Sequence, residues 1–202
     1  MPQSYPSVRA DVPAERSRPL HPKLRARTIV LVGLMGVGKT TVGRGLASAL
    51  QLPFKDSDEE VERAASRSIA EIFTQRGEAE FRDGERRVIS RLVTQEPSHV
   101  LALGGGAFML PETRALLKTQ THSVWLKADI DVIVKRVARR NTRPLLAGKD
   151  PKVVLSGFAE TRYPLYGEAA LTVEVGDTSS ASTVAAVIDA LTAHILDAGE
   201  TS

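Results

Sequence analysis

The feature that most limits the possible folds of this chain is a glycine-rich segment at residues 33–40, with the sequence GLMGVGKT. It fits the pattern G-x-x-x-x-G-K-[ST], follows an apolar β-branched run at residues 28–32, and precedes a helical pattern that reaches residue 50. In this order of strand, loop and helix, the glycines let successive N–H groups point into one concavity at the positive end of the helix. The segment therefore predicts a nucleoside triphosphate site in an α/β domain.

Residues of this segment suit particular parts of ATP and its magnesium ion. The Lys39 ammonium can bridge the β- and γ-phosphates, and the Thr40 hydroxyl can ligate Mg²⁺. ATP and Mg²⁺ are therefore the expected cofactors. The residues expected around ATP in this segment are Gly36, Val37, Gly38, Lys39, Thr40 and Thr41.

Strand-like and helical patterns alternate along the rest of the chain. A capping box, Ser68 with Glu71 three residues later, opens a helical region that reaches about residue 94. Five alternations predict a parallel sheet with helices on both faces, which is a three-layer α/β/α domain over residues 28–202. The expected strands are residues 28–32, 53–55, 100–103, 121–126 and 171–175.

The first 27 residues have a different composition from the rest. They hold six of the 27 basic residues, two of the 24 acidic ones and five of the eleven prolines, without apolar periodicity. Such a segment buries little apolar surface, so we expect a disordered, basic, proline-rich leader over residues 1–27. A transit peptide or a docking arm is the functional alternative. The remaining residues are nearly neutral, which argues against a nucleic-acid partner.

Composition excludes several other classes of protein. The chain has no cysteine, so it has neither disulfides nor a thiol nucleophile nor a thiolate metal site, and its four histidines are scattered. It has no apolar stretch approaching the roughly 18 residues of a membrane span, so we expect no membrane partner. The lack of cysteine fits a reducing compartment, and we place the protein in the cytoplasm.

Two aspartates, Asp56 and Asp58, follow the second expected strand. Ligands of doubly wound sheets bind at the carboxyl ends of the strands, and extended backbone would direct both carboxylates to one side. One could then hold Mg²⁺ through water, and the other could accept a proton from a substrate hydroxyl. The alternative is a helix N-cap, which is the commoner role of such a pair taken alone.

Further groups at this edge indicate a small anionic substrate. Arg82 shares a helical face with Glu85, a glycine run ends the third strand, and Arg162 ends a later helix. Arg143 lies in a basic segment expected to form a lid over the nucleotide, at about residues 139–156. Planar guanidinium groups bind carboxylates with two hydrogen bonds, so these arginines together favour a carboxylate substrate.

In order along residues 29–175, the motifs GLMGVGKT, DSD, SIAEIF…FRDGE, GGG, NTRPLL and RYPLY resemble those of the shikimate kinase family, in the nucleoside-monophosphate-kinase-like branch of P-loop proteins. The resemblance implies a strand order of 2-3-1-4-5 and a monomer. It also implies that ATP phosphorylates the 3-hydroxyl of shikimate, giving shikimate 3-phosphate and ADP, a step toward chorismate and the aromatic amino acids.

The resemblance also implies roles for individual residues. Asp58 matches the aspartate that contacts and deprotonates the hydroxyl, and Asp56 matches an aspartate that holds Mg²⁺ from its second coordination sphere. The catalytic residues so implied are Asp58, Lys39 and Arg143, with Arg143 also on the ATP phosphates. The implied shikimate ligands are Asp58, Arg82, Gly104, Gly105, Gly106 and Arg162. Either Arg139 or Arg140 could stack on adenine, whereas the loop at residues 176–180 has no basic residue.

Other functions are less consistent with the sequence. A gluconate kinase would have the same fold and a carboxylate substrate, but its His-Pro stretch is missing after the second strand. A nucleoside-monophosphate kinase needs a second phosphate where Asp58 stands, and a GTP switch needs an Asn-Lys-x-Asp motif, which is missing. An ATP-sensing regulator that turns nothing over has no need of Asp58, Arg82 and Arg162 together.

Overall fold

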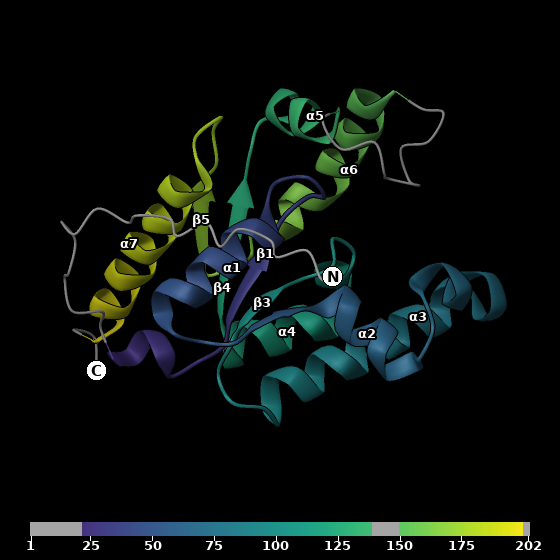
Figure 1. Cartoon of the computed structure of the whole chain (residues 1–202), viewed down its shortest axis with the longest axis horizontal. Helices are drawn as coiled ribbons and strands as arrows, with labels where there is room; N and C mark the ends of the chain where they lie inside the picture. The colour runs from purple at the N-terminus through teal and green to yellow at the C-terminus, as the bar shows by residue number, and fades with distance from the viewer. Residues whose placement is uncertain (1–21, 139–149, 200–202) are drawn as a thin grey trace, which may run out of the picture.

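Five parallel strands form one sheet in the order β2-β3-β1-β4-β5, in a computed structural model that describes residues 22–138 and 150–199. Helices cover both faces of the sheet, α1 and α7 on one and α3 and α4 on the other (Figure 1). The three-layer α/β/α fold and the expected strand order are both confirmed. The strands are β1 (Ile29–Val32), β2 (Phe54–Asp56), β3 (Val100–Ala102), β4 (His122–Lys127) and β5 (Leu171–Glu174).

The central position of β1 in the sheet explains why its sequence is apolar throughout. Every one of its four residues is buried, because parallel sheets are covered on both faces. Leu31 pairs with Ala102 of β3 on one side and with Val124 of β4 on the other. The glycine-rich loop after β1 therefore emerges at the carboxyl edge, between the ends of the neighbouring strands.

The helices follow the expected alternation with one addition. Helix α2, nine residues directly after β2, is not among the elements expected from the sequence. The Ser68 capping box is confirmed, since the Ser68 hydroxyl accepts from the Glu71 N–H and the Glu71 carboxylate accepts from the Ser68 N–H. The helices are α1 (Lys39–Leu50), α2 (Ser57–Ala65), α3 (Ile69–Thr94), α4 (Pro111–Gln120), α5 (Ile130–Ala138), α6 (Pro151–Tyr166) and α7 (Ser180–Gly199), with short 3-10 turns η1 (Pro22–Arg25) and η2 (Ala107–Met109).

The ordered fold starts earlier than the expected leader boundary at residue 27. Leu24 in η1 is fully buried in the core. The Arg25 guanidinium donates to the Gln51 side chain, and that of Arg27 donates to the Thr119 carbonyl. Residues 22–27 therefore belong to the folded domain, because one leucine is enough to fix a short turn that the surrounding basic composition conceals. Residues 1–21 lie outside the described residues.

The expected lid falls partly outside the description. Arg139, Arg140 and Arg143 belong to residues 139–149, which are not described. Residues 151–156, expected in the lid, are instead the first turns of α6, whose N-terminus Asp150 caps by accepting from the Lys152 N–H at 2.8 Å. Within the described part of the chain, no helix combines the length and apolar character needed to cross a membrane.

Candidate active site

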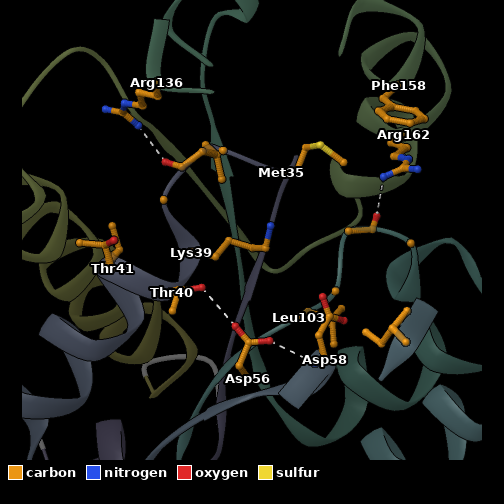
Figure 2. A pocket seen from close by; sticks show the side chains of 18 of the residues that line it. Met35, Lys39, Thr40, Thr41, Asp56, Asp58, Leu103, Arg136, Phe158 and Arg162 are labelled. Carbon is orange, nitrogen blue, oxygen red and sulfur yellow. Dashed lines mark hydrogen bonds between the residues drawn. The ribbon is translucent and has the colours of Figure 1, made fainter. Parts of the chain in front are cut away.

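A cleft of about 1100 Å³ opens at the carboxyl edge of the sheet (Figure 2). Its walls come from the loop after β1, the start of α2, the middle of α3, the glycine segment after β3, and α6. The structure brings together every expected site residue that it describes; Arg143 is outside the described residues. Those residues are Gly36, Val37, Gly38, Lys39, Thr40, Thr41, Asp56, Asp58, Arg82, Gly104, Gly105, Gly106 and Arg162.

The glycine-rich loop has the backbone of an anion-binding site. Gly36 and Gly38 adopt positive φ of 83° and 111°, a conformation that residues with a side chain rarely adopt. The Lys39 ammonium folds back over the loop and donates to the carbonyls of Gly33 at 2.8 Å and Leu34 at 3.1 Å. A positive charge and a helix N-terminus thus face the same hollow.

Asp56 links the loop to α2. Its Oδ2 accepts from the Thr40 hydroxyl at 3.1 Å, and its Oδ1 accepts from the Asp58 N–H at 3.1 Å, capping the helix. The helix N-cap interpretation of Asp56 is therefore confirmed, and the same side chain contacts Thr40, the other residue expected near Mg²⁺. No group of three or more Asp, Glu, His or Cys side chains suited to a metal occurs in the described ranges. Magnesium bound with phosphates takes only one or two protein ligands, so the oxygens of Thr40 and Asp56 fit this ion.

Asp58 reaches the cleft by a different route from the one expected. Asp58 lies in the first turn of α2 and not on the extended backbone that its position after a strand predicts, so that prediction is wrong, although the side chain does line the cleft as expected. Its carboxylate lies so close to Gly104 that a Cβ at that position would collide with it. Burial and the neighbouring Asp56 carboxylate raise the pKa of Asp58, against the opposing charges of Lys39 and Arg82. Ionised Asp58 is therefore a stronger proton acceptor than an ordinary aspartate.

Arg82 and Glu85 form the ion pair that their spacing predicts, with Arg82 Nη1 and Glu85 Oε2 at 2.7 Å. The Glu85 side chain is only 1% exposed, so the pair is not a solvated surface contact. Burial raises the pKa of Glu85, and the contact with Arg82 opposes this shift. The pair holds the guanidinium against Gly106, where a Cβ would lie 2.6 Å from both Nη atoms.

Arg162 flanks the glycine segment from the other side. Its guanidinium carbon lies 4.1 Å from the centre of the Phe158 ring, and its Nη1 donates to the Gly105 carbonyl at 3.1 Å. Figure 2 shows this stacking on α6, across the cleft from Asp56 and Asp58. Two guanidinium groups, Arg82 and Arg162, are thus held on the two sides of the glycine segment.

Arg136 on α5 is a cleft residue that sequence reasoning missed. It donates to the Val37 carbonyl at 2.8 Å and to the Gly176 carbonyl at 2.6 Å, which ties the glycine-rich loop to the loop after β5. The only signal in the sequence is a group of basic residues at 135–140. Choosing among them requires knowing which face of α5 meets the loop.

Comparisons with known proteins agree on one family. A family model described as shikimate kinase matches residues 35–192. A shikimate kinase from Caulobacter vibrioides is 61% identical over 168 residues, covering 83% of this chain and 84% of the relative. The solved structure of a shikimate kinase from Acinetobacter baumannii in complex with shikimate superposes with a TM-score of 0.77 at 36% identity, covering 83% of this chain and 93% of that one.

A gluconokinase from Sinorhizobium meliloti also resembles this chain in structure, with a TM-score of 0.61. It covers 88% of this chain and 98% of its own, but only 20% of the residues are identical. That similarity extends to the fold alone.

Proposed function

The chain belongs to the shikimate kinase family, so its reaction is the ATP-dependent phosphorylation of shikimate, and we propose how the residues of the cleft share that reaction. One observation carries the assignment of roles. A phosphate-binding loop, an aspartate with a raised pKa and two guanidinium groups all open into the same cleft.

The ATP half of the cleft is the end nearest α1. We assign the triphosphate to the loop N–H groups of Gly36, Val37 and Gly38 together with Lys39, because these surround the helix N-terminus. Thr40 and Asp56 would hold Mg²⁺, which when bound neutralises phosphate charge. Thr41 and Arg136 line the same end, and the Arg136 guanidinium, fixed between two loops, offers a planar surface for the base. Arg143 remains the arginine assigned to the phosphates.

The shikimate half lies between α3 and α6. We assign the carboxylate of shikimate to Arg82 and Arg162, which stand on either side of the glycine segment. The ring would lie against Gly104, Gly105 and Gly106, where the missing side chains leave room for it. Because Asp58 lies across the cleft from Arg162 (Figure 2), a carboxylate held by the arginines would leave the hydroxyl-bearing edge of the ring facing Asp58.

The chemical step needs positioning and charge neutralisation more than covalent participation. Asp58 orients the 3-hydroxyl and takes its proton as the oxygen bonds to the γ-phosphorus of ATP and the bond to the ADP oxygen breaks. Lys39 and Arg143 stabilise the charge on the transferring group. The products are shikimate 3-phosphate and ADP. In keeping with the family resemblance, we propose that the enzyme is monomeric and cytoplasmic.

The test is a coupled ADP-release assay with shikimate, gluconate and nucleoside monophosphates as acceptors. We expect turnover with shikimate, and a ³¹P spectrum of the product that identifies the 3-phosphate. Faster turnover with gluconate would instead assign the cleft to a sugar acid. Tight ATP binding without turnover of any acceptor would support the regulator that only senses ATP.

A further inference from the structure

We propose that Tyr166, a residue outside the cleft, positions the glycine segment so that Arg162 is free to bind substrate. The inference rests on the proposed function, because it concerns the shikimate half of the same site. Tyr166 is a positioning residue, since it acts through Gly105 and through its contact with Arg162 and does not line the cleft.

This inference depends on one acceptor, the Gly105 carbonyl, that two side chains share. The Tyr166 hydroxyl donates to the Gly105 carbonyl at 2.6 Å, and Arg162 Nη1 donates to the same oxygen at 3.1 Å. The Tyr166 side chain is fully buried, with its ring 6.1 Å from the rings of Phe108 and of Trp125, so the hydroxyl has a fixed position. Burial also raises the pKa of Tyr166, which keeps the phenol protonated as a donor.

Fixing the Gly105 carbonyl also fixes the next N–H. The peptide bond is planar and trans, so the Gly106 N–H must point away from Tyr166. The Gly104 N–H is already used, since it donates to the Ser57 hydroxyl at 2.8 Å. Within the described residues, the N–H groups of Gly105 and Gly106 donate to no protein atom. These two donors are therefore available to a ligand in the cleft.

The shared acceptor also bears on how Arg162 binds substrate. A carboxylate in the cleft draws the Arg162 guanidinium away from the Gly105 carbonyl. Gly105 is half-buried, and a carbonyl there that loses its only donor is less well satisfied than one that keeps a second donor. With Tyr166 in place, Gly105 keeps a partner when Arg162 turns to the substrate.

Helix α6 offers a matched control. Tyr163, three residues earlier, donates its hydroxyl to the Ala128 carbonyl at 2.8 Å and packs on Trp125 at 5.0 Å between ring centres. Tyr163→Phe and Tyr166→Phe therefore each remove one hydroxyl-to-carbonyl hydrogen bond and keep the ring. Only the Tyr166 bond ends on the glycine segment.

The experiment measures steady-state constants for both substrates, with Tm as the measure of folding. We expect Tyr166→Phe to raise the KM for shikimate about tenfold, with kcat and the KM for ATP within about twofold of wild type. We expect Tyr163→Phe to leave the KM for shikimate, the KM for ATP and kcat within about twofold of wild type, even if its Tm falls as much as that of Tyr166→Phe.

Several results would overturn the inference. One is an unchanged KM for shikimate in folded Tyr166→Phe, and another is an equal rise in the KM values for shikimate and ATP. If Tyr166→Phe does not fold, Ser57→Ala frees the Gly104 N–H at the other end of the segment, and an unchanged KM for shikimate there would count against the inference too. A wild-type enzyme that does not phosphorylate shikimate would instead refute the proposed function.

Discussion

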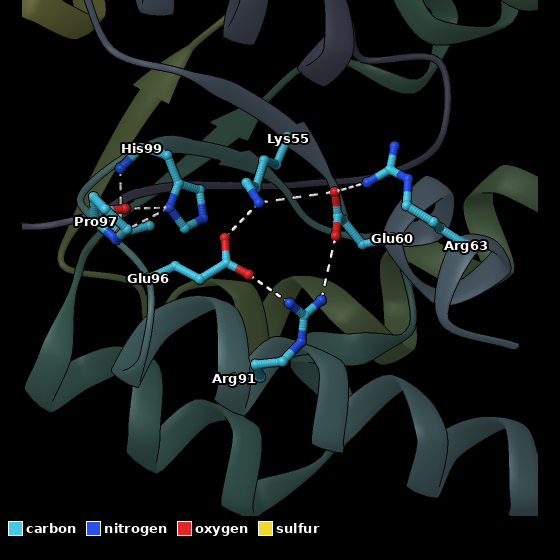
Figure 3. Close-up of polar contacts among 8 residues, drawn as sticks. Lys55, Glu60, Arg63, Arg91, Glu96, Pro97 and His99 are labelled. Atoms are coloured by element: carbon cyan, nitrogen blue, oxygen red, sulfur yellow. Dashed lines mark hydrogen bonds and ion pairs between the residues drawn. The ribbon is translucent and has the colours of Figure 1, made fainter.

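Two clusters of charged side chains share the elements β2, α2 and α3, yet the pKa is raised for Asp58 and Glu85 in one and lowered for Glu96 in the other. The cleft cluster opens into the active site and consists of Lys39, Asp56, Asp58, Arg82 and Glu85. The outer cluster, drawn in Figure 3, contains no residue that lines the cleft and consists of Lys55, Glu60, Arg63, Arg91 and Glu96.

In the outer cluster each carboxylate meets at least two cations. Arg91 reaches Glu60 at 3.3 Å and Glu96 at 2.6 Å, and Lys55 pairs with both acids as well. The hydrogen bond from Lys55, aided by the charge of Arg91, lowers the pKa of Glu96. The fold therefore favours the ionised form of Glu96, which is the behaviour of a stabilising ion pair.

In the cleft cluster the fold disfavours the ionised forms of Asp58 and Glu85. Burial raises the pKa of both Asp58 and Glu85; the Asp56 carboxylate adds to the shift of Asp58, and the Asp58 carboxylate adds to the shift of Glu85. The Asp58 carboxylate accepts no hydrogen bond within the described residues, whereas Glu85 has Arg82. The comparison indicates that the cleft gives up stability to hold a reactive acid, a pattern typical of functional sites.

Neutralising one carboxylate in each cluster should give the largest difference in kcat between the two clusters. We expect Asp58→Asn to lower kcat by about a thousandfold, because it removes the proton acceptor, and to leave the Kd for ATP unchanged. Glu60→Gln in the outer cluster is the control and should keep kcat while lowering Tm. Measured by ADP release and calorimetry, an Asp58→Asn enzyme with wild-type turnover would remove Asp58 from catalysis.

Removing one arginine from each cluster should give the second-largest effect, on the KM for shikimate. Arg82→Ala should raise the KM for shikimate about 10- to 100-fold, through the loss of a charge-assisted bond to the carboxylate, and change the KM for ATP far less. Arg91→Ala also breaks contacts with buried Glu60, but should change only Tm. Equal rises in the two KM values for Arg82→Ala would argue against carboxylate binding.

The pH dependence of activity should respond to the cleft cluster and not to the outer cluster. Where Asp58 takes up its proton, kcat/KM for shikimate should fall by at most about tenfold per pH unit. The pKa of Asp58 is raised, so kcat/KM for shikimate should begin to fall at a pH above the usual aspartate range near 4, as the acid takes up a proton. Glu96→Gln should leave this profile where it is. Activity that stays constant down to about pH 4 would contradict the raised pKa of Asp58.

The regular parts of the molecule could be predicted because they depend on local patterns. The apolar run at residues 28–32 and the capping box at Ser68 each lie within a few consecutive residues, so they can be recognised without knowing the fold. The convergence of Asp58 and Arg82 followed from a rule about strand ends together with a family resemblance, and the cleft bears it out.

What the sequence could not supply depends on contacts across long separations. Asp56 both ends β2 and caps α2. The sequence alone does not distinguish an aspartate that only ends a strand from one that also begins a helix, so α2 was not predicted. Arg136 and Tyr166 matter through backbone carbonyls 99 and 61 residues away, and carbonyls carry no sequence signal. Leu24 is one apolar residue in a basic segment, and only its contacts with the core show that it is folded.

The central claim is that the cleft holds Asp58 at a cost in stability, whereas the outer cluster gains stability from Glu96. A raised pKa in the folded state means that the ionised carboxylate is penalised at neutral pH, and the penalty disappears as the pH falls to where folded and unfolded chains are both protonated. A lowered pKa gives a contribution that is present at neutral pH and is lost as the pH falls through the folded-state value.

The most direct measurement is urea unfolding of wild type, Asp58→Asn and Glu96→Gln at pH 7 and at successively lower pH. At pH 7 the free energy of unfolding should be higher than wild type for Asp58→Asn and lower for Glu96→Gln, and both differences should shrink as the pH is lowered. An Asp58→Asn protein less stable than wild type at pH 7 would contradict the account.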